Sequence, residues 1–572
     1  MMDRRFFLAL VLTAIVVFLT PVIFPSANQA ARDSARARDS IATATAGSAP
    51  RSPITANAAV TTLPQTTPGA VATRPDSPAG AAPVSIRAET TIVETAKSRY
   101  RFSSIGAVPL VAELREFRKL RGATGVVELG RPGEPLLRYR LISPNDTVSL
   151  ANVSFRLERS GEPSSPVLTY AADVAGRHVT IKYAFPNDTN YDIRVRTDIA
   201  GGTAAYLVTE LPNGFHSFEA DTVEDAANLA YVVKPTRAGA KGIPFAKLDP
   251  GEKRIEAGPV AWAAAKSKYF IVGILSPRDG KTTASFAEVD LGGAPRTSKV
   301  VSEGRAAVVI PINAGAAEFD VYAGPQEWKK LLAIGRGFED ANPYGGFFAG
   351  VVQPFATIVM RVLLWMKAST GLSYGWVLVI FGLVIRLALW PLNQSAMRNN
   401  MKLQRVQPEL QAVQAKYKND PAKLQTEMML VYKAHGMSPF STFSGCLPML
   451  LPMPILFALF FVFRSTIEFR GVSFLWLPDI SLMDPYYILP VVMGASMFLL
   501  SWIGMKNQPP NPQAKMMGYI FPVMMTFLFL RFASGLNLYY AVQNFAAIPQ
   551  QWMLTKERSK SATVATVRTA KA

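Results

Sequence analysis

Long apolar runs occur in two separate parts of the chain. The first, Phe6–Phe24, follows Arg4 and Arg5 and has nearly the ~20 residues needed to cross a bilayer. We therefore predict a retained transmembrane signal anchor over 1–25, in preference to a cleaved signal peptide, whose apolar core is shorter. The other runs lie beyond residue 370: Tyr374–Leu392, Leu447–Phe463, Tyr487–Ile503 and Met517–Trp552.

The last of these runs is too long for one crossing, and Ala533-Ser534-Gly535 divides it into two helices. With the anchor, this predicts a polytopic α-helical membrane protein with six transmembrane helices. The five-helix core would occupy residues 371–555, with spans at about 372–392, 446–464, 486–504, 517–533 and 535–554.

Between residues 87 and 335 the long apolar runs are absent, and apolar and polar residues alternate with a period of two instead. Val179, Ile181, Tyr183 and Phe185 share one face of a predicted strand, and a second alternating strand follows the turn signal Pro186-Asn187-Asp188. Similar strands are predicted at Leu136–Ile142, Val153–Leu157, Tyr269–Leu275, Phe286–Leu291 and Ala306–Ile312. The pattern predicts a large all-β sandwich domain. Before it, residues 26–86 are rich in Ala, Pro and Thr, which is typical of a disordered linker.

The position of basic residues predicts the topology. Phe347–Met366 has apolar residues at helical spacing, but Gln353 and Arg361 interrupt the run. If it crossed the membrane, the basic segment Arg398–Lys433 would lie outside the cytoplasm, against the positive-inside rule. We therefore predict an amphipathic interfacial helix within 340–370. Both termini, including the basic tail 556–572, are then cytoplasmic, and the β-sandwich is periplasmic in a multi-pass protein of the inner membrane.

Composition excludes several kinds of chemistry. The 572 residues are 49% hydrophobic and carry a formal net charge of +19, which favours anionic partners such as lipid, the ribosome or nucleic acid. No motif indicates direct nucleic-acid specificity. One cysteine, Cys446, cannot form an intramolecular disulfide, and the three histidines lack metal-ligand spacing. Without a phosphate loop or a convincing triad signature, we expect no enzyme activity, metal or cofactor.

Residues 393–443 are predicted to form a helical hairpin in the cytoplasm. Apolar stripes contain Met401, Val406, Leu410 and Val413, then Leu424, Met428, Leu430 and Val431, and Asp420-Pro421 is the start signal of the second helix. Basic side chains decorate the outside: Lys402, Arg405, Lys416, Lys418 and Lys423. These charges fit a solvated face beside anionic lipid and fit recruitment of clients equally well.

Arg386 is the candidate functional residue because it lies inside the apolar run Val377–Trp390, about one turn from its end. A charge at a helix centre costs about 2.5–3.5 kcal/mol on insertion scales. Snorkelling to the interface is one explanation. A hydrated intramembrane groove is the explanation we prefer, since no Asp or Glu occurs in the later spans. Other polar residues could line this groove: Ser496, Asn537, Gln543 and Asn544. A single polar residue of this kind more often forms a hydrogen bond between neighbouring helices than a contact with substrate.

Five stretches in this order resemble the YidC family of bacterial membrane protein insertases, in its Gram-negative form. They are Ile385–Leu392, Gln407–Ala412, Gly445–Ile455, Asp484–Pro490 and Ser534–Tyr540. The resemblance implies a five-helix core around a hydrophilic groove, in which Arg386 is the groove arginine and Tyr540 contacts substrate. It implies nascent membrane proteins as clients and the Sec translocon, the ribosome and the signal recognition machinery as partners, without a nucleotide or metal. Pro452, within Pro448-x-x-x-Pro452-x-Pro454, and Gly382 depart from the family pattern.

Two other classes of protein compete with this interpretation. A membrane-anchored envelope carbohydrate-binding protein or enzyme would act through the β-domain, but that region shows no paired carboxylates or His–acid cluster, and Arg386 would stay unexplained. A small-molecule transporter would predict internal repeats, which the sequence does not show.

Overall fold

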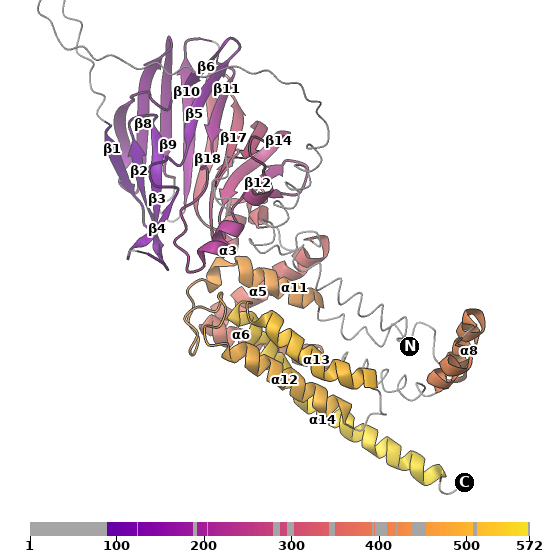
Figure 1. Cartoon of the computed structure of the whole chain (residues 1–572). Coiled ribbons are helices and arrows are strands. Elements are labelled where there is room, and N and C mark those ends of the chain that lie inside the picture. Colours follow the sequence, from indigo (N-terminus) through magenta and orange to yellow (C-terminus); the bar gives the residue numbers. More distant parts are fainter. Residues whose placement is uncertain are drawn as a thin grey trace, which may run out of the picture.

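The computed structural model describes residues 88–122, 124–186, 191–202, 204–277, 286–293, 303–342, 349–391, 394, 406, 409–418, 420–436, 453–506 and 512–569. The predicted anchor (1–25), the predicted linker (26–86) and residues 446–452 of the predicted second core span lie outside this part of the chain. An all-β part and a helical part make up the described structure (Figure 1).

The first sheet of the β-domain has four antiparallel strands in chain order: β1 (Thr90–Glu94), β2 (Ser98–Ser103), β3 (Val108–Arg118) and β4 (Val126–Leu129). One face of β2 is buried: Tyr100 and Phe102 are 1% and 0% exposed. The ring of Phe102 packs edge-on against Tyr183 of the second sheet, with the centroids 4.8 Å apart. This sheet therefore covers part of the second one.

The second sheet has fourteen strands, and its path runs β6-β5-β11-β17-β16-β14-β15-β18-β10-β9-β8-β7. Off this path, β12 pairs with β14, and β13 pairs with β12. Its strands are β5 (Arg138–Ser143), β6 (Asp146–Ser149), β7 (Arg156–Glu162), β8 (Ser165–Val174), β9 (Arg177–Ala184), β10 (Asp192–Ala200), β11 (Tyr206–Glu210), β12 (Ala230–Pro235), β13 (Lys241–Pro244), β14 (Lys253–Lys266), β15 (Phe270–Leu275), β16 (Phe286–Gly293), β17 (Gly304–Pro311) and β18 (Ala316–Pro325). The predicted all-β domain is confirmed.

Most of the predicted strands are present. β9 and β10 pair in antiparallel register, and the apolar face of β9 is buried, as the alternation predicts. The exception is Val153–Leu157, because β7 begins only at Arg156. Ser154 instead forms an isolated bridge to Ile105. A five-residue alternation is too short to fix where a strand begins, since the pairing partner decides this.

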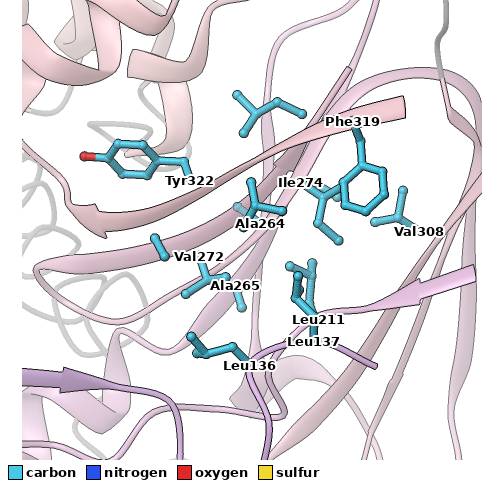
Figure 2. Packing of buried hydrophobic residues seen from close by; sticks show 14 of the residues in the cluster. Leu136, Leu137, Leu211, Ala264, Ala265, Val272, Ile274, Val308, Phe319 and Tyr322 are labelled. Atoms are coloured by element: carbon cyan, nitrogen blue, oxygen red, sulfur yellow. The ribbon is translucent and has the colours of Figure 1, made fainter. Parts of the chain in front are cut away.

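The large sheet folds over its own core. Five strands lie between β5 and β18 along the sheet, yet the rings of Tyr139 in β5 and Phe319 in β18 have centroids only 6.4 Å apart. The Tyr139 and Tyr183 hydroxyls are hydrogen-bonded at 2.8 Å. Figure 2 shows side chains from β14, β15, β17 and β18 converging on this interior, together with Leu136, Leu137 and Leu211 from outside those strands.

The helical part contains α5 (Ala349–Thr370), α6 (Tyr374–Ala388), α11 (Met453–Ser465), α12 (Ile488–Met505), α13 (Pro512–Phe529) and α14 (Ser534–Thr569). The predicted break at Ala533-Ser534-Gly535 does separate α13 from α14. Gly535 is required there, because a Cβ would lie 2.5 Å from the Phe463 ring of α11. α14 continues beyond the predicted span end at residue 554, into the predicted basic tail.

Few of the described helices are both long enough and apolar enough to span a membrane. α12 alone is long and apolar enough to cross a membrane by itself. α5 and α6 pass the same test only as a pair bent by 118°, and α11 and α13 contribute shorter apolar segments. The number of transmembrane helices therefore stays a prediction.

The predicted hairpin packs as two helical segments. Residues 409–416 are helical, and α8 covers Pro421–Ala434. Asp420 caps α8 by accepting a hydrogen bond from the backbone N–H of Lys423 at 3.1 Å. Val406, Leu410 and Met428 are buried together as predicted. Leu430 is 52% exposed, however, and Tyr432 takes its place in the small core, because the helix turns 100° per residue.

The β-domain and the helical part are joined by more than the chain that connects them. The loop between α11 and α12, residues 466–487, packs against the β-domain, and its Ile467 belongs to the β-domain core. Arg470 of this loop forms a buried ion pair with Glu219, and Tyr269 donates a hydrogen bond to Ser481 at 3.1 Å. We call this contact the α11–α12 loop interface.

Candidate functional site at the contact between α6 and α14

Arg386 lies in the last turn of α6, where the helix ends at Ala388 and Leu389 is its C-cap. Its Nη2 donates a hydrogen bond to Oε1 of Gln550 in α14, at 2.7 Å. Its Nε is buried and has no partner. A guanidinium carries five N–H donors, so this side chain keeps hydrogen-bonding capacity that the described structure does not use. A cation with spare donors can bind an anionic or carbonyl group.

Gln550 is the hydrogen-bond partner of Arg386 that the sequence interpretation missed. It is 1% exposed, and its Nε2 donates to the Trp390 carbonyl at 3.2 Å. The available signal was spacing: Gln550 follows Gln543 by seven residues, and two helical turns place both on one face of α14. Helical spacing alone does not show which neighbour this face contacts.

Gln543, seven residues before Gln550 in α14, also connects α14 to α6. Its Nε2 donates to the Gly382 carbonyl of α6 at 2.7 Å and lies 3.3 Å from the Tyr539 hydroxyl. Gly382 has no side chain, and a Cβ there would lie 3.1 Å from Val542 of α14. The glycine therefore permits the close approach that brings Gln543 to the backbone of α6.

The other polar residues proposed for the groove lie in different places. Asn544 donates to the Ser496 hydroxyl of α12 at 3.0 Å, on a second face of α14. Asn537 is fully buried near the start of α14 and donates to the Phe529 carbonyl, while its Oδ1 has no partner. The Tyr540 ring packs edge-on against Phe529, with the centroids 5.3 Å apart. The structure brings Gln543 and Arg386 to one helix contact and separates them from the rest.

The basic residues of the hairpin are exposed where they are described. Lys416 and Lys418 face solvent, and the Lys423 side chain is 73% exposed. Lys423 lies 3.7 Å from Asp420, a weak ion pair at this exposure. Lys402 and Arg405 lie outside the described residues. Within the part of the chain that the structure describes, no group of His, Cys, Asp or Glu is placed to hold a metal ion.

Two family models match the chain and agree with this division into two parts. Residues 365–561 match the 60Kd inner membrane protein model, and residues 91–358 match the YidC periplasmic domain model. The helical part and the β-domain therefore define an inner-membrane protein with a large periplasmic domain.

Similar proteins point to the same family. A membrane protein insertase YidC of Anaeromyxobacter dehalogenans (strain 2CP-C) is 33% identical over 66% of this chain and 67% of its own. The YidC insertase of Pelodictyon phaeoclathratiforme is 30% identical over 76% of this chain and 75% of its own. The chain spans about two thirds of the length of the first relatives it matches. It belongs to the YidC family of membrane protein insertases.

A solved structure of an active YidC insertase is also similar to the chain. The two chains are 19% identical, and the match covers 81% of this chain and 93% of the solved one, with a TM-score of 0.32.

Proposed function

We propose that this protein inserts nascent membrane proteins into the inner membrane, assists their folding, and uses Arg386 to attract their polar segments. The observation that carries the proposal is a guanidinium inside an apolar helix whose described partner is a neutral amide. Its positive charge is therefore not cancelled by that contact. The apolar runs that follow Arg386 contain no Asp or Glu.

Physical chemistry explains how such a charge would assist insertion. A client must move a polar segment across hydrocarbon, and a hydrated groove around Arg386 would shorten that path. Two opposite charges 4 Å apart attract by about 1 kcal/mol in water and by about 4 kcal/mol at an effective dielectric constant near 20. Clients with acidic residues in the translocated segment would therefore be attracted most strongly. We place Gln543 beside Arg386 in this groove. We propose that Tyr540, Asn544, Asn537 and Ser496, which lie at other contacts of α14 and α12, line its remaining part.

The proposed topology has six transmembrane helices, with both termini in the cytoplasm and the β-domain in the periplasm. In this arrangement α5 lies along the membrane interface. Its bend of 118° relative to α6 supports this, as does the exposure of Phe355, Ile358 and Trp365, which are 40%, 58% and 66% exposed. These side chains would contact lipid, and aromatic residues are enriched at that depth.

The hairpin would recruit clients on the cytoplasmic side. Lys416, Lys418 and Lys423 are exposed and supply positive charge outside the membrane, together with Lys402 and Arg405 in the sequence. Incoming chains, the ribosome, the signal recognition machinery and anionic lipid are the partners that this charge fits. We also propose cooperation with the Sec translocon. Depleting Sec while following each client would separate Sec-dependent from independent insertion.

One insertion experiment tests the groove and the hairpin together. Two clients are compared that differ only in the charge of the translocated segment, which is acidic in one and neutral in the other. Their insertion is measured by protease protection in cells in which the tested variant is the only insertase of this kind. Arg386→Ala should lower insertion of the acidic client roughly fivefold or more relative to the neutral one, since about 1 kcal/mol is the lower limit of the attraction. Arg386→Lys keeps the charge and should retain activity.

Replacing Lys416, Lys418 and Lys423 together by Gln should instead lower insertion of both clients equally, because recruitment precedes translocation. Equal insertion of acidic and neutral clients by the Arg386→Ala protein would refute the electrostatic role. A selective effect of the three Gln replacements on one client would refute recruitment by the hairpin.

A further inference from the structure

Gln550 connects α14 to α6 through both ends of one amide. Its Oε1 accepts from Arg386 Nη2 at 2.7 Å, and its Nε2 donates to the Trp390 carbonyl at 3.2 Å. Neither partner can exchange its role, because a guanidinium only donates and a backbone carbonyl only accepts. Only one orientation of the amide therefore satisfies both contacts.

Because Gln550 is 1% exposed, water does not compete for these contacts. An arginine side chain has many rotamers, and fixing it in one direction costs up to about 2 kcal/mol of conformational entropy. A buried amide that is itself held by the Trp390 carbonyl, just beyond the end of α6, can offset this cost. A neutral partner also leaves the charge of Arg386 intact, whereas Asp or Glu at position 550 would cancel it.

We propose that Gln550 is a positioning residue for Arg386: it holds the guanidinium in one direction at the end of α6 without neutralising it. This inference rests on the proposed role of Arg386 in attracting acidic segments. The Trp390 carbonyl fixes the amide, and the amide fixes Nη2. The positive charge and the donors other than the buried Nε stay available to a client.

A matched control exists on another face of α14. Thr555 is 6% exposed, and its one hydroxyl proton is shared between the Ile503 carbonyl of α12, at 3.2 Å, and the Gln551 carbonyl of its own helix, at 2.9 Å, so it also links two helices. It has no contact with Arg386 among the hydrogen bonds of the described residues. Thr555→Val removes this bond at nearly constant volume and should leave the ratio of acidic to neutral client insertion unchanged.

The test measures that ratio for Gln550→Met, Gln550→Glu, Arg386→Ala and the double variant Gln550→Met with Arg386→Ala, at equal amounts in the membrane. Gln550→Met should lower the ratio roughly two- to tenfold, the usual effect of losing one hydrogen bond. Gln550→Glu keeps an acceptor for Arg386 but cancels its charge, so it should lower the ratio as far as Arg386→Ala does. In the Arg386→Ala background, Gln550→Met should have no further effect on the ratio.

Two results would overturn the inference. A ratio unchanged by Gln550→Met, while Arg386→Ala lowers it, would show that Gln550 does not act through Arg386. Equal losses for both clients that persist in the Arg386→Ala background would show that Gln550 only holds the helices together. If Arg386→Ala itself leaves the ratio unchanged, the proposed function fails, and that outcome is recognised without any Gln550 variant.

Discussion

Replacing Arg470 with methionine should loosen the α11–α12 loop interface. Nε of Arg470 lies 3.0 and 2.8 Å from the two carboxylate oxygens of Glu219, and the two side chains are only 5% and 6% exposed. Nη2 also donates to the Arg118 carbonyl at 2.9 Å, and the guanidinium lies over the Phe270 ring at 5.4 Å. One side chain therefore makes several of the contacts that join the loop to the β-domain.

The magnitude follows from the burial of this pair. Removing one partner of a buried ion pair costs about 3–5 kcal/mol, because the other charge stays buried without compensation. A cost of this size raises the equilibrium constant for opening the interface by roughly two to three and a half powers of ten. Burial also raises the pKa of Glu219, and the attraction of Arg470 only partly offsets this. Removing Arg470 would raise this pKa further, and because a buried carboxylate can be relieved by taking up a proton, we expect the cost to lie at the lower end of the range.

Native-state proteolysis of the purified protein measures the effect, because cleavage within 466–487 follows the population of the open interface. Arg470→Met should accelerate cleavage there by roughly a hundredfold. Arg470→Met combined with Glu219→Leu should recover most of the loss, since two apolar side chains replace a buried ion pair at little cost. Arg254→Met is the control, because its partner Glu252 lies 3.1 Å away on an exposed surface. Cleavage of the Arg470→Met protein at the rate of this control, or a double variant as open as the single one, would refute the reasoning.

Two further predictions concern pH and topology. Burial raises the pKa of Glu468 to about 7, and Glu327 adds to the shift. Because this pKa is raised in the folded state, the stability it contributes is full below about pH 4 and is lost as pH rises through about 7. Glu468→Gln should make the thermal unfolding temperature depend less on pH between about pH 5 and 7.5. If the variant and the unchanged protein show the same pH dependence, another group causes it. Single cysteines at the exposed Ser164 and Lys423, in a Cys446→Ser background, should label from the periplasm and the cytoplasm respectively. Labelling of both from one side would contradict the proposed topology.

Local patterns in the sequence determined the kinds of elements and the family. The alternation around Val179–Phe185 predicts a half-buried strand because successive side chains of a strand point to opposite faces, and β9 has this pattern of burial. Asp420-Pro421 predicts a helix start because a carboxylate can accept from the first free N–H groups, and α8 starts there. Arg386 was conspicuous for an equally local reason, as one charge within an apolar run.

Contacts between distant segments were decided only by the tertiary structure. Arg386 and Gln550 are 164 positions apart, and Glu219 and Arg470 are 251 apart. The sequence predicts six polar residues along one groove, but on α14 the face of Gln543 meets α6 and the face of Asn544 meets α12. Periodicity fixes which residues share a face, because the backbone sets the angle between them. Which neighbour that face meets depends on how whole helices and sheets pack, and single-sequence patterns do not carry that information.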